Sequence, residues 1–149
     1  GLAARARGLA KRVSALVRRP ESLAECQALG IANEVTLDPA EAVAGADLVV
    51  LCTPISGMAG LAKRTLSDLK PGTVITDVGS TKQQLVAELT PLCAGAGTHF
   101  VGSHPMAGSN QTGPGAARAK RSRAHRRHPR PQAPRRSCHL PMRWAAIAP

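Results

Sequence analysis

The fold class is decided by the stretch Asp47-Leu48-Val49-Val50-Leu51-Cys52-Thr53-Pro54. Its first six residues form a nearly continuous apolar run of strand length, the pattern of a strand that is buried on both faces of a parallel sheet. The following Thr53-Pro54 ends this strand. Because helices cover the faces of a parallel sheet, the sequence on either side should alternate helices with strands.

The residues upstream show this alternation. Gly8 and Gly30 suit the left-handed backbone that follows a helix end, and Asp38-Pro39-Ala40-Glu41 has the form of a capping box at a helix start. The sequence therefore predicts the end of a helix within residues 1–10, a strand at 13–17, a helix at 20–29 and a short helix that reaches about residue 44.

The residues downstream continue the pattern. Apolar residues recur at helical spacing from Ile55 to Leu69, and Lys70-Pro71-Gly72 breaks this helix. A strand at 73–77, a helix from about 82 to 92 and a last strand at 99–102 follow. Together these elements predict an α/β fold, a doubly wound parallel sheet covered by helices, in residues 1–119.

Residues 120–149 differ from this domain in charge and pattern. Of the 20 lysine and arginine residues, ten lie in residues 1–115 beside all nine acidic residues, and the other ten lie in 116–149 without any acid. Because 120–149 has no apolar period, we expect a disordered basic tail. Nucleic-acid binding through this tail is an alternative function, but its one aromatic residue, Trp144, predicts phosphate contacts without sequence preference.

The composition also excludes several classes of protein. The four cysteines are widely spaced and form no C-x-x-C pair, so neither a zinc site nor a disulfide framework is indicated. No apolar run approaches the roughly 18 residues needed to span a bilayer. We therefore expect a cytoplasmic protein that uses no metal and has no membrane partner.

Polar turns follow three of the predicted strands. They are Cys52-Thr53-Pro54, the turn from Asp77 to Lys82 and the turn from Gly102 to Ser109. Each turn by itself is explained by ordinary turn chemistry. Because the strands are parallel, however, all three turns should open onto the same edge of the sheet, where doubly wound folds bind their ligands.

The chain resembles the prephenate dehydrogenase family from about Gly8 to Ala119. The resemblance rests on Asp77-Val78-Gly79-Ser80-Thr81-Lys82, on Gly102-Ser103-His104-Pro105-Met106-Ala107-Gly108 and, upstream, on residues 46–54. It implies the Rossmann-like dinucleotide-binding half of an NAD- or NADP-dependent oxidoreductase of tyrosine biosynthesis. Such an enzyme converts prephenate to 4-hydroxyphenylpyruvate by oxidative decarboxylation. Arogenate is the alternative substrate, and the resemblance also implies a homodimer.

The resemblance assigns roles to individual residues. His104 matches the family's catalytic histidine, and histidine suits a general base because its ordinary pKa lies near neutral pH. Ser80 matches the serine that hydrogen-bonds the reacting hydroxyl and helps to orient the histidine and the cofactor. Lys82 either holds a substrate carboxylate or is solvated, and we interpret His99 as structural.

Other residues are assigned to the cofactor. Thr53 and Pro54 resemble the family's turn beneath the nicotinamide, and Ser109 is a weaker candidate for the same site. Val17 occupies the place of the usual acidic residue at the end of the second strand of the fold, and Arg18 and Arg19 follow it. Arginine there can accept the 2′-phosphate of NADP or start a solvated helix, so NAD and NADP both stay open.

The chain departs from the family at both ends. It contains no G-x-G-x-x-G pattern, so we expect the first strand and the phosphate loop to be missing and dinucleotide binding to be weak. The family's helical second domain has no counterpart after Ala119, where the Arg/Pro-rich composition is common in coding sequence read out of frame. We expect this chain by itself to be an inactive fragment, with a genuine tail as the alternative.

Overall fold

The computed structural model describes residues 1–105, 114–116 and 142–147. The elements in these residues alternate as predicted, with two additional strands. In chain order they are α1 (Leu2–Ala6), β1 (Arg12–Leu16), α2 (Pro20–Ala28), β2 (Glu34–Thr36), α3 (Pro39–Val43), β3 (Leu48–Leu51), α4 (Ile55–Thr65), the 3-10 helix η1 (Leu66–Asp68), β4 (Val74–Asp77), α5 (Gln83–Gly95), β5 (His99–Val101), the 3-10 helix η2 (Pro114–Ala116) and β6 (Arg143–Ile147).

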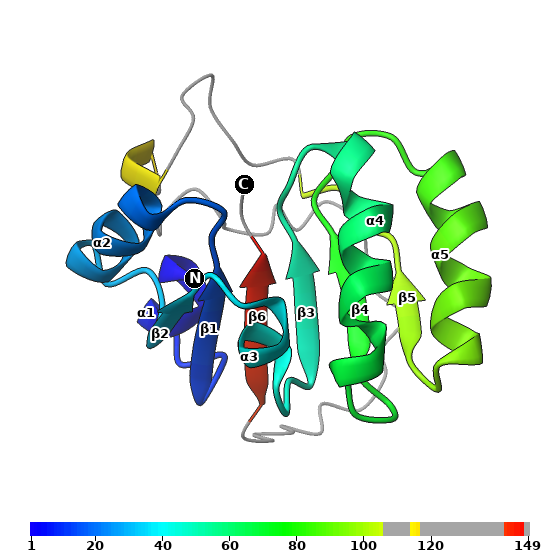
Figure 1. Ribbon diagram of the computed structural model, residues 1–149, viewed down its shortest axis with the longest axis horizontal. Helices are drawn as coiled ribbons and strands as arrows, with labels where there is room; N and C mark the ends of the chain where they lie inside the picture. The colour runs from blue at the N-terminus through cyan, green and yellow to red at the C-terminus, as the bar shows by residue number, and fades with distance from the viewer. Residues whose placement is uncertain (106–113, 117–141, 148–149) are drawn as a thin grey trace, which may run out of the picture.

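The strands form a six-stranded sheet in the order β2-β1-β6-β3-β4-β5, and every neighbouring pair is parallel. All six arrows therefore point the same way in Figure 1, and the carboxyl ends of all the strands lie at one edge of the sheet. We call this the carboxyl edge. The predicted α/β class is confirmed. The common edge is confirmed for the turns at 52–54 and 77–82 and for residues 102–105 of the third turn, whose other residues lie outside the described ones.

The larger core lies between the sheet and the helices α3, α4 and α5. In Figure 1, α3 and α4 cross the sheet on the side nearest the viewer. Side chains of β3, β4 and β6 meet those of the helices there, and the largest fully buried ones in this cluster are Leu51, Met58, Ile75, Leu89 and Ile147. A smaller cluster on the other face packs α1 against β1 through Ala4, Val13 and Ala15.

Local signals in the sequence set several element boundaries. Gly8 and Gly30, predicted as helix stops, both have a φ of 60°, a conformation that costs glycine little. Asp38 caps α3, since its Oδ1 accepts a hydrogen bond of 2.8 Å from the backbone N–H of Ala40. In a capping box, the glutamate would accept the N–H of the capping residue directly. Here Thr36 lies between them: the Asp38 N–H donates to Thr36 Oγ1, and this hydroxyl donates to Glu41.

The two strands that the sequence did not predict are β2 and β6. The three residues of β2 pair only with β1 and are too short for a recognisable apolar pattern. β6 corrects the expectation that residues 120–149 are a disordered tail, because Arg143–Ile147 pairs with β1 on one side and β3 on the other. The expectation rested on the Arg- and Pro-rich composition of the tail as a whole, and a five-residue segment that contains Trp144 and Ile147 is too short to change that average. The tail residues 117–141 and 148–149 lie outside the described residues.

With β6 included, the strand order of the sheet can be compared with that of Rossmann domains. Rossmann domains have the strand order 3-2-1-4-5-6, in which the first strand lies between the second and the fourth. The predicted second strand of this chain is β1, and the described order places β6 between β1 and β3. The last strand in the chain therefore occupies the place that the first strand has in that order.

Candidate active site at the carboxyl edge

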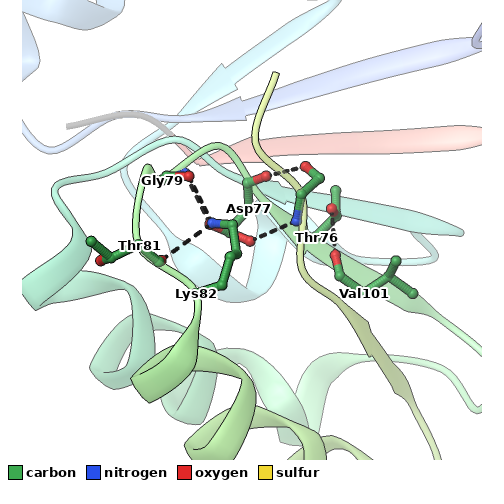
Figure 2. Close-up of polar contacts among 7 residues, drawn as sticks. Thr76, Asp77, Gly79, Thr81, Lys82 and Val101 are labelled. Atoms are coloured by element: carbon green, nitrogen blue, oxygen red, sulfur yellow. Dashed lines mark hydrogen bonds and ion pairs between the residues drawn. The ribbon is translucent and has the colours of Figure 1, made fainter. Parts of the chain in front are cut away.

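The turns after β4 and β5 are joined through one buried carboxylate, that of Asp77. Asp77 is the last residue of β4 and is fully buried. Its Oδ2 accepts a hydrogen bond of 2.8 Å from the backbone N–H of Gly79, and its Oδ1 accepts one of 3.0 Å from the backbone N–H of Ser103. Figure 2 shows the Asp77 side chain between the two turns. One side chain thus binds its own turn and a second turn, in which Ser103 is 26 residues away in the sequence.

Two further contacts join the same turns. The Ser103 hydroxyl donates to the backbone carbonyl of Asp77. In the last pair of the β4–β5 register, Thr76 Oγ1 donates to the carbonyl oxygen of Val101 at 2.7 Å (Figure 2). Backbone and side-chain bonds therefore continue the β4–β5 ladder into the turns that carry Ser80 and His104.

Lys82 provides the positive charge that accompanies Asp77. Its ammonium group forms an ion pair with Asp77 Oδ2 and donates to the carbonyl oxygens of Gly79, at 2.7 Å, and Thr81, at 3.4 Å. Figure 2 shows these contacts within the turn. An ammonium group has three donor hydrogens, so its hydrogen-bonding capacity is directed at the turn. The structure places Lys82 in contact with Asp77 and with this turn, and its role toward a substrate carboxylate stays a prediction.

Two glycines of the recognised motifs allow the close packing around this ion pair. A Cβ on Gly79 would lie 2.9 Å from Cγ1 of Ile55 and 3.0 Å from Oδ2 of Asp77. A Cβ on Gly102 would lie 3.2 Å from Cδ of Lys82. A side chain at position 79 would therefore be too close to Ile55 and Asp77, and one at position 102 would require a small shift of Lys82.

Ser80 and His104, the predicted catalytic residues, lie on these two turns. Each directly follows a residue whose backbone N–H is bound by Asp77, and both side chains are exposed at the carboxyl edge. They are thus available to a ligand that binds over the ends of β4 and β5. His99 lies at the opposite end of β5 from His104 and is exposed.

The turn after β3 forms the neighbouring part of the edge. Pro54 is the N-cap residue of α4, and the Cys52 N–H donates to the Ile147 carbonyl at 2.8 Å, which ties this turn to β6. Thr53 Oγ1 is buried and has no hydrogen-bond partner in the described residues. Burial raises the pKa of the Cys52 thiol above its ordinary value, so this cysteine stays protonated at neutral pH and is a poor nucleophile.

The other predicted positions have different outcomes. Arg18 is exposed two residues after the end of β1, at the same edge. Ser109 lies outside the described residues. Within the described part of the chain, no group of histidine, cysteine, aspartate and glutamate side chains could hold a metal ion, and no helix is long and apolar enough to cross a membrane.

The residues present fit the nicotinamide end of a dinucleotide better than its pyrophosphate. Toward the nicotinamide, the unpartnered hydroxyl of Thr53 offers a donor and an acceptor. Toward the pyrophosphate, a Rossmann domain uses a glycine-rich turn after its first strand. Among the described residues, β6 occupies that strand position.

Sequence reasoning did not identify Asp77 or Ser103 as members of the site. The sequence contains a signal for Asp77: a carboxylate at the end of a buried strand is itself expected to be buried, and a buried carboxylate needs hydrogen-bond or ion-pair partners. The lysine five residues later, Lys82, is a fitting partner. The Ser103 contact depends on how two strands pair and has no signal in the local sequence.

The strand order and the polar turns collected at the carboxyl edge define a dinucleotide-binding α/β domain. The family model for the prephenate dehydrogenase nucleotide-binding domain matches residues 1–125. The chain therefore belongs to this family of oxidoreductases.

Relatives and solved structures agree with this assignment. A prephenate dehydrogenase of Lactococcus lactis subsp. cremoris is 45% identical over 73 residues, which are 48% of this chain and 21% of that protein. The crystal structure of the Aquifex aeolicus prephenate dehydrogenase in complex with hydroxyphenyl propionate and NAD+ matches with a TM-score of 0.74 and 28% identity, over 83% of this chain and 42% of that one. The Synechocystis arogenate dehydrogenase matches with a TM-score of 0.69 and 25% identity, over 78% and 40%. The chain spans less than half of each of these relatives.

Proposed function

We propose that this domain binds NAD or NADP and provides the base for the oxidative decarboxylation of prephenate to 4-hydroxyphenylpyruvate. The observation that carries the proposal is the joining of the Ser80 and His104 turns by Asp77 at the carboxyl edge. Membership of the prephenate dehydrogenase family supports the reaction class. The NAD+ in the Aquifex aeolicus complex supports the cofactor.

The reaction needs a hydride acceptor and a proton acceptor. The nicotinamide supplies the first when it is bound, because it takes up a hydride from the ring carbon that carries the hydroxyl. His104 is the second: its neutral imidazole accepts the hydroxyl proton as that carbon becomes a carbonyl carbon. The bond from the ring to the carboxylate breaks, carbon dioxide leaves, and the electron pair of that bond makes the ring aromatic. The electron pair reaches the carbonyl oxygen, which takes the proton back from His104. The products are therefore 4-hydroxyphenylpyruvate, carbon dioxide and the reduced cofactor, and His104 is neutral again.

Ser80 orients the reacting hydroxyl. A serine hydroxyl can donate one hydrogen bond and accept another, so Ser80 can contact the substrate oxygen while the imidazole of His104 accepts the proton. Both side chains are exposed at the edge, where a substrate can reach them. Ser80 does not keep the proton, so its loss should affect turnover less than the loss of His104.

The cofactor is proposed to lie across the turns after β1, β3 and β4. Thr53, with its unpartnered hydroxyl, is assigned to the nicotinamide side together with Pro54. Arg18 is assigned to the ribose side, where its charge favours the 2′-phosphate of NADP without excluding NAD. Arogenate is the alternative substrate, supported by the match to the Synechocystis arogenate dehydrogenase. A homodimer is the assembly we propose for the full-length gene product.

The test of the proposal is His104→Asn in the full-length gene product, with prephenate and NAD+ or NADP+. Asparagine keeps a hydrogen-bonding side chain but cannot act as a base, so turnover should fall by roughly 10²–10⁴ while the dinucleotide dissociation constant changes little. His99→Asn is the matched control, because His99 is also exposed but lies at the start of β5, at the end of the strand opposite the turn that carries His104. Normal turnover in His104→Asn would refute the proposal.

A further inference from the structure

We propose that Asp77 is a positioning residue that sets the separation of Ser80 from His104 by holding the backbone before each of them. This inference rests on the proposed function of these two side chains. Asp77 itself is buried and faces the two turns, so it is not expected to contact the substrate.

The geometry divides the carboxylate evenly between the two turns. Oδ2 binds the N–H of Gly79, the residue before Ser80, at 2.8 Å. Oδ1 binds the N–H of Ser103, the residue before His104, at 3.0 Å. The two oxygens belong to one rigid planar group. The carboxylate therefore sets a fixed distance between the two backbone segments that it binds.

The remaining contacts hold the carboxylate in its orientation. Lys82 pairs with Oδ2 and also donates to the carbonyl of Gly79, so the same turn is bound through both its N–H and its C=O. The Ser103 hydroxyl binds the Asp77 carbonyl. Hydrogen bonds to a charged acceptor are the stronger class in proteins, and full burial of Asp77 removes competition from water.

This rigidity has a chemical use. The serine hydroxyl and the imidazole must meet the same substrate hydroxyl at the same time, and a displacement of about 1 Å can cost on the order of 10²-fold in rate. Both groups are on turns, which are usually more mobile than the strands that they follow. A carboxylate at the end of β4 extends the rigidity of the sheet to the two residues that precede the reacting groups.

The first experiment measures the amides of Gly79 and Ser103 by NMR in the chain itself, with Asp77→Asn as the variant. Asparagine has nearly the same shape but one acceptor oxygen in place of two, so it can hold only one of the two amides. At least one amide should lose the low-field shift of a carboxylate-bound proton and exchange about 10- to 100-fold faster with solvent. Unchanged shifts and exchange at both amides would overturn the proposal.

Asp47→Asn is the matched control. Asp47 also accepts a backbone N–H, that of Arg143, and also pairs with a lysine, Lys70, but it precedes β3 at the opposite edge. The same chemical change there should leave the amides of Gly79 and Ser103 as they are in the parent chain. If Asp47→Asn changed them equally, the effect would be general loosening, and Asp77 would have no special role.

The second experiment separates positioning from stability in the full-length gene product. Asp77→Asn leaves Lys82 without its anion, and the double variant Asp77→Asn/Lys82→Met removes that unpaired charge. We expect the double variant to unfold at a higher temperature than Asp77→Asn, while kcat stays about 10- to 100-fold below the parent value and KM for prephenate changes little. Recovery of kcat together with stability would mean that Asp77 is merely structural, which would overturn the inference.

The two proposals fail in different ways. If His104→Asn has normal turnover but Asp77→Asn releases the amides, the catalytic assignment is wrong and Asp77 still fixes the two turns. If His104→Asn loses turnover but Asp77→Asn changes neither the amides nor kcat, the proposed function stands and the positioning role does not.

Discussion

The place of β6 in the sheet is tested most directly by Ile147→Ala. Ile147 is fully buried in the larger core, opposite Leu16 of β1 and Leu51 of β3 in the strand register. The substitution removes three carbon atoms, and at about 0.8 kcal/mol for each buried CH2 group the transfer cost alone is about 2.4 kcal/mol. The cavity left between the sheet and the helices adds to this value, so the total should be about 2–5 kcal/mol.

The assay is equilibrium unfolding in urea, read by circular dichroism, with the free energy of unfolding taken from the midpoint and slope. Ile75→Ala is the positive control, because Ile75 is the same residue type, equally buried and in the same cluster, but on β4. Val101→Ala is the negative control, since Val101 on the edge strand β5 is 55% exposed.

The two isoleucine variants should lose similar stability, and Val101→Ala should lose about 0.5 kcal/mol or less. A small loss for Ile147→Ala, of about 0.5 kcal/mol or less, beside a full loss for Ile75→Ala would show that residues 143–147 do not belong to the core. The original expectation of a disordered tail would then be correct over its whole length.

Two further predictions concern the edges of the sheet. Gly79→Ala should lower the free energy of unfolding by about 1–3 kcal/mol, because its Cβ would contact Ile55 and Asp77; Gly57→Ala in the helix α4, where a Cβ meets nothing within 4 Å, should be neutral or stabilising in the same urea assay. The hydrogen bond from the Arg143 N–H, and after it Lys70, hold the pKa of Asp47 below its ordinary value. The contribution of Asp47 to stability is therefore complete above about pH 3.9, the pKa of an unfolded aspartate. This contribution is lost as the pH falls through the lower pKa of the folded state. The stability difference between the parent and Asp47→Asn should therefore shrink in acid, and a difference that stays constant with pH would contradict this.

The predicted part of the fold is the part whose signals are local. The apolar run at 48–51, the cap at Asp38 and the stops at Gly8 and Gly30 each depend on a few neighbouring residues, and the structure has each of them. β6 could not be predicted in this way, because five residues with a tryptophan and an isoleucine become a strand only where two existing strands leave a place between them. That place is defined by β1 and β3, which lie far away in the sequence.

The candidate site shows the same division. The turns and their common edge follow from the order of strands and from motif spacing, both of which are present in the sequence. The bond between Asp77 and Ser103 joins residues on two strands, and its existence depends on the β4–β5 register, Thr76 opposite Val101. Lys82 was singled out for its charge, but its direction toward Asp77 was decided by the conformation of the turn from 79 to 82.

The two ends of the cofactor site depend on different parts of the chain. Asp77, Gly79 and Ser103 organise the proposed reacting end through contacts within residues 77–103, none of which involves β6. The pyrophosphate end of a Rossmann domain depends on the turn after the strand between β1 and β3, and among the described residues that strand is β6. Weak dinucleotide binding by this chain would therefore leave the Asp77 arrangement intact, because the alignment of the reacting groups and the affinity for the phosphates are built from separate strands of the same sheet.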